Sequence, residues 1–145
     1  MKSFLFTILL VALNGCDILP SNNTIYRPNS PSTNSEKGEF DTLMEKDKIN
    51  KIKVNAEVVT YLLNETQPQD KMTAVVVDNN SSCDLILRML EIRTNQIYNL
   101  PVPKNSKNQF VIKKGNYTLK SNVCAAKYYS QKYISEPLIL ALSNR

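Results

Sequence analysis

Residues 73–92, TAVVVDNNSSCDLILRMLEI, hold two apolar runs separated by a polar segment. The first run is rich in valine, which favours an extended chain because a β-branched side chain packs well on a pleated surface. The segment between the runs, residues 78–82, consists of Asp, Asn and Ser, which are typical of turns. We therefore predict a strand, a turn and a second strand, with Cys83 at the start of the second strand.

Five further apolar runs follow this strand pair, at residues 97–102, 109–112, 117–123, 128–134 and 137–142. Six or seven short strands at close intervals predict a small antiparallel β-sandwich over residues 70–145. The run 117–123 alternates, so we expect Tyr117, Leu119, Ser121 and Val123 to share one face. The run 97–102 contains Pro101, which favours an edge strand. The chain has no tryptophan, so the domain is immunoglobulin-like at most in its architecture.

One amphipathic helix is predicted before the sandwich, over residues 39–66. Its apolar residues recur at spacings of three and four, which places them on one stripe of a helix: Ile49, Ile52, Ala56, Val59 and Leu63. Three arrangements remain open for this helix. It packs across the β domain, it pairs with a second copy as a short coiled coil, or it stands apart from the domain.

The chain begins MKSFLFTILLVALNGC, residues 1–16, with a basic residue, an apolar core and a small residue before Cys16. This order is typical of a secretion signal. An apolar core of about ten residues makes a helix of about 15 Å, which is half the thickness of a hydrocarbon core. The stretch resembles a bacterial lipoprotein signal, and the resemblance implies that residues 1–15 are removed and that Cys16 carries the lipid. Cleavage without lipid, or a buried N-terminal element, are the alternatives.

The lipoprotein signal implies a domain outside the cytoplasm, anchored in the cell envelope, although it does not say in which membrane. Residues 16–38 then follow as the lipidated cysteine and a tether, because this stretch is rich in Ser, Asn, Thr and Pro. If Cys16 is the anchor, Cys83 and Cys124 remain as a pair. In an oxidising compartment we predict that they form a disulfide that joins strands distant in sequence. Two free thiols are the alternative.

The composition argues against catalysis. The chain has no histidine, which excludes the Ser-His-Asp and Cys-His systems and removes the commonest metal ligand. Three scattered glycines cannot form a phosphate-binding loop. We therefore predict no catalytic residue, no metal and no cofactor. One enzymatic alternative stays open, a small hydrolase that uses Asp78 and Asp84 as paired carboxylates on either side of one turn.

A candidate binding patch lies late in the chain, where three tyrosines stand beside two lysines: Tyr128, Tyr129, Tyr133, Lys127 and Lys132. Exposed tyrosines beside cations are suited to a protein or a glycan. Half-buried core tyrosines are the alternative. The net charge of +5 is mild and fits either a solvated basic face or contact with anionic lipid or acidic polysaccharide. A nucleic acid partner is not expected for an exported protein.

Three segments, VVVDNNSSCD, NLPVP and KKGNYTLKSNVCAAKY, lie between residues 73 and 144. With them the chain resembles a domain of unknown function found in small Bacteroidetes-type lipoproteins. The resemblance implies an extracytoplasmic β domain and transfers no catalytic residue. The sequence thus predicts a membrane-anchored lipoprotein with a binding or envelope-structural role and no enzymatic activity. An inhibitor or immunity-type protein is the main alternative.

Overall fold

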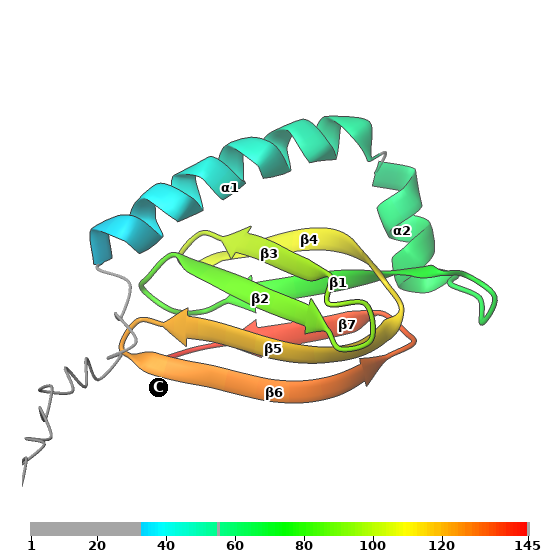
Figure 1. Ribbon diagram of the computed structural model, residues 1–145. Helices are drawn as coiled ribbons and strands as arrows, with labels where there is room; N and C mark the ends of the chain where they lie inside the picture. Colours follow the sequence, from blue (N-terminus) through cyan, green and yellow to red (C-terminus); the bar gives the residue numbers. More distant parts are fainter. Residues whose placement is uncertain (1–32, 55, 145) are drawn as a thin grey trace, which may run out of the picture. The chain divides into compact units, whose positions relative to one another are not determined.

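The computed structural model describes residues 33–54 and 56–144 (Figure 1). The predicted signal, Cys16 and most of the predicted tether lie outside these residues. In the described part of the chain, two helices precede seven strands. Their bounds are α1 Thr33–Lys53, α2 Ala56–Asn64, β1 Met72–Asn79, β2 Leu85–Glu91, β3 Ile97–Val102, β4 Ser106–Lys113, β5 Gly115–Val123, β6 Ala126–Ile134 and β7 Leu138–Leu142. Neither helix is both long enough and apolar enough to span a membrane.

The strands form two sheets, as expected for a sandwich. One sheet has the order β4-β1-β7 and the other has the order β3-β2-β5-β6. The proline-containing strand β3 is an edge strand, as predicted. The expectation of a wholly antiparallel sandwich is wrong, because β7 pairs with β1 in parallel. Parallel neighbours need a long connection, and the intervening strands β2 to β6 supply it.

The core lies between the two sheets and consists of inward-facing side chains from both. Strand β5 alternates as predicted, with Tyr117, Leu119, Ser121 and Val123 all buried. Strand β1 is buried on both faces over most of its length. Its outer face is covered in part by α2, which packs against β1 and β4 and buries Leu62. The β-branched run at residues 73–77 thus forms the central strand of its sheet.

The prediction of one helix over residues 39–66 is wrong. Helix α1 begins at Thr33, inside the predicted tether, and ends at Lys53, and α2 starts at Ala56. The break divides the expected apolar stripe, and Ile49 is 54% exposed. Among the α1 side chains that the structure describes, the buried ones are instead Phe40 and the charged Asp47. The apolar stripe did not predict the bounds of α1, because polar contacts hold much of this helix on the sandwich.

The first of these contacts joins α1 to β2. Arg88 donates two hydrogen bonds to the carboxylate of Glu39, at 2.7 and 2.8 Å, and a third to Asn99 Oδ1 at 3.1 Å. One turn earlier in α1, Glu36 accepts a hydrogen bond from Asn122 on β5 at 3.2 Å. A bidentate arginine–carboxylate pair fixes orientation as well as distance. These contacts place the first half of α1 on the outer face of the four-stranded sheet.

The second contact closes the gap between the two sheets. Asn108 on β4 is buried, and its amide donates to Asp47 at 3.0 Å and to the carbonyl of Pro101 at 2.8 Å. Lys51 donates to Asp47 at 2.9 Å and also to Asn108 Oδ1. The buried Asp47 carboxylate is thus paired with both Asn108 and Lys51, as buried polar groups require. Figure 1 shows α1 on the side of β3 and β4, away from β6 and β7.

Docking of α1 should depend on pH through Glu39. The hydrogen bonds from Arg88 hold the pKa of Glu39 below its ordinary value of 4.5. A lowered pKa means that the pair stabilises the folded chain above about pH 4.5 and that this contribution is lost as the pH falls through the folded-state value. Both side chains are more than a third exposed, so the contribution is about 1 kcal/mol or less.

Amide hydrogen exchange measures this effect directly. We expect the protection of α1 to fall between pH 6 and pH 3.5 in the native chain. In the variant Glu39→Gln, protection should already be lower at pH 6 and should change less over the same range. Equal profiles for the two proteins would show that the pair does not hold α1.

Candidate functional site

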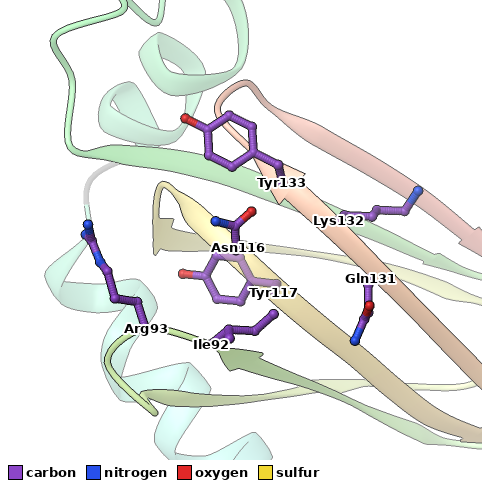
Figure 2. Close-up of a pocket in the computed structure, with 7 residues that line it drawn as sticks. All are labelled: Ile92, Arg93, Asn116, Tyr117, Gln131, Lys132 and Tyr133. Carbon is purple, nitrogen blue, oxygen red and sulfur yellow. The ribbon is translucent and has the colours of Figure 1, made fainter.

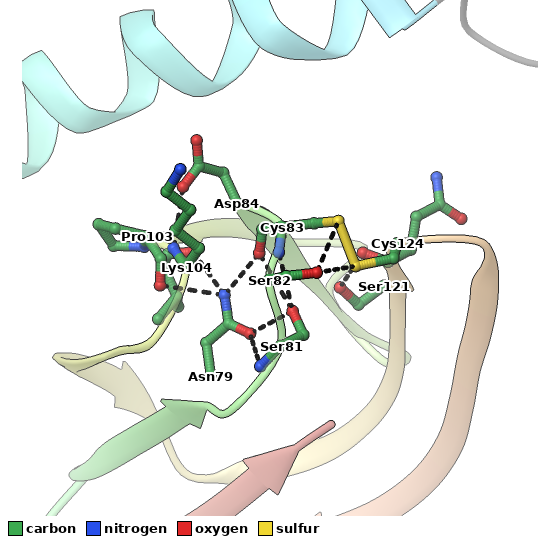
Figure 3. Close-up of a disulfide and its surroundings, with 11 residues drawn as sticks. Asn79, Ser81, Ser82, Cys83, Asp84, Pro103, Lys104, Ser121 and Cys124 are labelled. Carbon is green, nitrogen blue, oxygen red and sulfur yellow. Dashed lines mark hydrogen bonds between the residues drawn. A yellow bond between two sulfur atoms is a disulfide. The ribbon is translucent and has the colours of Figure 1, made fainter. Parts of the chain in front are cut away.

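The predicted disulfide is present at one end of the sandwich (Figure 3). Cys83 precedes β2 and Cys124 follows β5, with their Cα atoms 5.4 Å apart. Strands β2 and β5 are hydrogen-bonded neighbours, so the bridge joins two strands within one sheet. Ser82 Oγ lies 3.6 Å from Cys124 Sγ. Both sulfurs are bonded to each other, so neither cysteine is a free thiol.

The turn beside the disulfide is built on the side chain of Asn79. Its amide nitrogen donates to the carbonyls of Cys83 at 2.9 Å, Pro103 at 3.0 Å and Val102 at 3.2 Å. Its amide oxygen accepts from the backbone N–H and the hydroxyl of Ser81, at 3.1 and 2.7 Å. Asn79 and Ser81 are fully buried. The polar segment DNNSS therefore ties the β1–β2 turn to the end of β3.

Asp78 and Asp84, the candidate hydrolytic pair, each have a local structural partner. Asp78 lies on β1 and pairs with Lys107 at 3.3 Å. Asp84 accepts a hydrogen bond from the backbone N–H of Lys104 at 2.8 Å. Asp78 lines a hollow of about 650 Å³ together with Asn80, Asn105, Ser106, Lys107 and Ser143. Asp84 does not line this hollow, so the structure does not gather the two carboxylates there.

The candidate patch on β6 is divided by the alternation of the strand. Tyr129 and Tyr133 are 60% and 71% exposed and lie on the outer face of the sheet. Lys127 occupies the same face by its position. Tyr128 faces inward and packs against the core. For this tyrosine the alternative of a half-buried core residue therefore holds. Lys132 is an even number of residues from Tyr128 and so lies on the same face of the strand, but it is exposed.

Neighbouring residues outside the predicted patch hold the ring of Tyr129. Lys120 of β5 lies directly opposite Tyr129 in the register, and its Nζ is 5.7 Å from the ring centroid. The amide of Gln131 donates a hydrogen bond to the hydroxyl of Tyr129 at 3.0 Å. The alternation of β5 predicts an outward position for Lys120, because Lys120 stands between the inward-facing Leu119 and Ser121.

Tyr133 stands beside a hollow of about 330 Å³ at the other end of the same face (Figure 2). The hollow combines two tyrosines, an apolar side chain, two amides and two cations, and its lining residues are Ile92, Arg93, Asn116, Tyr117, Gln131, Lys132 and Tyr133. Asn116 is the cross-strand partner of Tyr133. Ile92 is 51% exposed. Of this set, only Tyr133 and Lys132 belong to the binding patch predicted from the sequence.

The titratable groups beneath the hollow have structural partners. Glu91 is buried, and it accepts hydrogen bonds from the backbone N–H and the hydroxyl of Thr94, at 2.6 and 2.5 Å. The hydroxyl contact is the main cause that lowers the pKa of Glu91. Burial raises the pKa of Tyr117, whose hydroxyl donates to the carbonyl of Lys113 at 2.7 Å. Gly115 leaves room for Glu91, since a Cβ there would lie 3.1 Å from the Glu91 side chain.

These features define the class as a mainly β domain of two packed sheets with one disulfide. Residues 45–145 match the family described as Domain of unknown function (DUF6759), and the chain belongs to this family. The match begins within α1 and includes every strand. No curated protein and no solved structure matches the chain.

Proposed function

We propose that the protein is a lipid-anchored, extracytoplasmic binding module without catalytic activity. Its recognition surface is the outer face of β5 and β6, which we call the tyrosine face: Tyr129, Tyr133, Lys120, Asn116 and Gln131. The Cys83–Cys124 disulfide supports a location outside the cytoplasm, because such bonds persist in oxidising compartments. The signal-like start of the chain supports an anchor at Cys16.

The exposure of two tyrosines on one face carries this proposal. Tyr129 and Tyr133 are 60% and 71% exposed, whereas the other aromatic residue of β6, Tyr128, packs against the core. Tyrosine combines a large rigid contact area with a polar tip, and it is enriched in binding surfaces for that reason. Where the structure describes its side chains, α1 makes polar contacts with Arg88, Asn108 and Asn122 and none with the ring of Tyr129 or Tyr133.

Site-specific photo-crosslinking in intact cells tests the proposed surface. A benzophenone amino acid replaces Tyr129 or Tyr133 in the full chain, and Ile139 on β7, which is 72% exposed, is the matched control position. We expect one envelope component to crosslink from both tyrosine positions and not from Ile139. Crosslinking from Ile139 alone, or equally from all three positions, would contradict the proposal.

The same sample tests the anchor and separates the alternative roles. Mass spectrometry of the N-terminal peptide should show acyl chains on Cys16, and an unmodified Cys16 would refute the anchor. If the captured component is an enzyme whose activity the protein lowers, the chain is an inhibitor or immunity-type protein. If it is a structural polymer or protein of the envelope, the binding role stands as proposed.

A further inference from the structure

We infer that the hollow beside Tyr133 binds a carboxylated sugar unit of an anionic glycan chain. This inference rests on the proposed function and names the ligand class for the tyrosine face. Tyr133 supplies a stacking surface, Asn116 and Gln131 bind sugar hydroxyls, and Arg93 and Lys132 attract the carboxylates. Four observations support these assignments.

The ring of Tyr133 is available on the surface. It is 71% exposed, and among the residues that the structure describes no ring, cation or hydrogen-bonding group engages it. Tyr129, by contrast, is already held by Lys120 and Gln131. Ile92 adds an exposed apolar side chain to the same hollow. The C–H face of a sugar ring gains dispersion contact and loses contact with water when it packs on such a surface.

The two amides of the hollow suit hydroxyl groups. An Asn or Gln side chain donates and accepts at the same time, and so does a sugar hydroxyl. Asn116 lies opposite Tyr133 in the strand register, and Figure 2 shows its amide between the Tyr133 side chain and Ile92. Gln131 lines the hollow from the next outward position of β6. A ligand on the Tyr133 ring therefore meets polar groups at its edge.

The charge around the hollow favours an anion. Its lining contains Arg93 and Lys132 and no acidic residue. Within the described residues, neither cation forms a salt bridge. Glu91 acts on Arg93 through its charge, but its carboxylate is buried and bound to Thr94. The positive potential of Arg93 and Lys132 at the surface can therefore attract an anionic ligand.

The arrangement of the two rings favours a chain over a single sugar. Tyr129 and Tyr133 are four residues apart on one strand face, which places them about 13 Å apart, more than one sugar ring spans. Lys120 and Lys127 continue the basic character toward Tyr129. An added protein strand is disfavoured at β6, because Lys127 and Lys132 lie on this edge strand and lysines protect such edges from pairing.

Isothermal titration of the detergent-solubilised full chain tests the inference. The probes are polygalacturonate, which carries a carboxylate on each sugar, and its methyl ester, which has the same sugars without the charge. We expect binding of polygalacturonate that weakens as salt is added and weaker binding of the ester. Tyr133→Ala should weaken the Kd roughly tenfold, and Tyr133→Phe should retain most of the affinity because it keeps the ring.

The charge variants Arg93→Gln and Lys132→Gln should weaken polygalacturonate binding and leave ester binding unchanged. The control variant Ile139→Ser should bind both probes as the native chain does. Thermal unfolding of each variant establishes that it is folded. Equal binding of polymer and ester would overturn the role of charge, and polymer binding that is indifferent to Tyr133→Ala would overturn the site.

Vesicles of anionic phospholipid serve as a further probe. If they bind as tightly as the polymer and Tyr133→Ala has no effect, general charge attraction explains the data and the inference is wrong. If no glycan binds while crosslinking from Tyr133 still captures a protein, the glycan inference fails and the proposed binding function remains. The two results are therefore distinguishable.

Discussion

Replacing Cys83 and Cys124 together by alanine is expected to lower the free energy of unfolding by about 4 kcal/mol. The bridge closes a loop with a sequence separation of 41, and its loss returns that conformational freedom to the unfolded chain. Domains of this size are stable by only about 5–15 kcal/mol, so the loss is a large part of the total. Urea denaturation of the native and double-variant chains at neutral pH measures it.

Two controls isolate the effect of the bridge. The native chain in the presence of a reductant should unfold at the same urea concentration as the double variant, because both lack the crosslink. Ser82→Ala, beside the sulfurs, should change the unfolding free energy by less than about 0.5 kcal/mol, since Ser82 is exposed. Equal urea midpoints for the native chain and the double variant would show that the bridge contributes nothing to stability.

Asn79→Ala is expected to cost about 3 kcal/mol of unfolding free energy. The change removes the donor shared by the carbonyls of Cys83, Val102 and Pro103. It also removes the acceptor of Ser81. A buried polar group without a partner costs about 1–3 kcal/mol, and several groups lose theirs here. Urea denaturation again gives the measurement, with hydrogen exchange at the β1–β2 turn as a local readout.

Asn80→Ala is the matched control for Asn79→Ala. Asn80 is exposed and belongs to the same turn, and its backbone N–H donates to the carbonyl of Leu142 at 2.8 Å. We expect a change within about 0.5 kcal/mol. If both variants lower the free energy of unfolding equally, the loss reflects the turn as a whole and not the hydrogen bonds of Asn79.

Much of the β domain was predictable because its signals are local. Alternation placed the buried face of β5, from Tyr117 to Val123. Pro101 identified β3 as an edge strand, because proline lacks the N–H that a second neighbour would require. Cysteine pairing followed from a count, once Cys16 was assigned to the anchor. These inferences needed only residue types and their spacing.

The helical region and the candidate site were less predictable because their signals are contacts across the chain. Helix α1 docks through Glu39 and Arg88, which are 49 positions apart. An apolar stripe in the sequence does not predict such a pairing. The hollow beside Tyr133 is lined by residues of β5, β6 and the turn that follows β2. Ile92 and Asn116 carry no local mark of function, and only the strand order brings them to Tyr133.

The sequence by itself determined the strands, the disulfide pair and an aromatic segment beside lysines, since β-propensity, alternation and cysteine parity act over a few residues or through composition. Only the tertiary structure decided that β7 pairs in parallel with β1, that α1 and α2 are separate, and that Tyr129 and Tyr133 face outward while Tyr128 packs inward. The physical reason is that burial and pairing are properties of neighbours in space. A side chain on β6 becomes core or surface according to what lies opposite it, and that is settled when the two sheets pack.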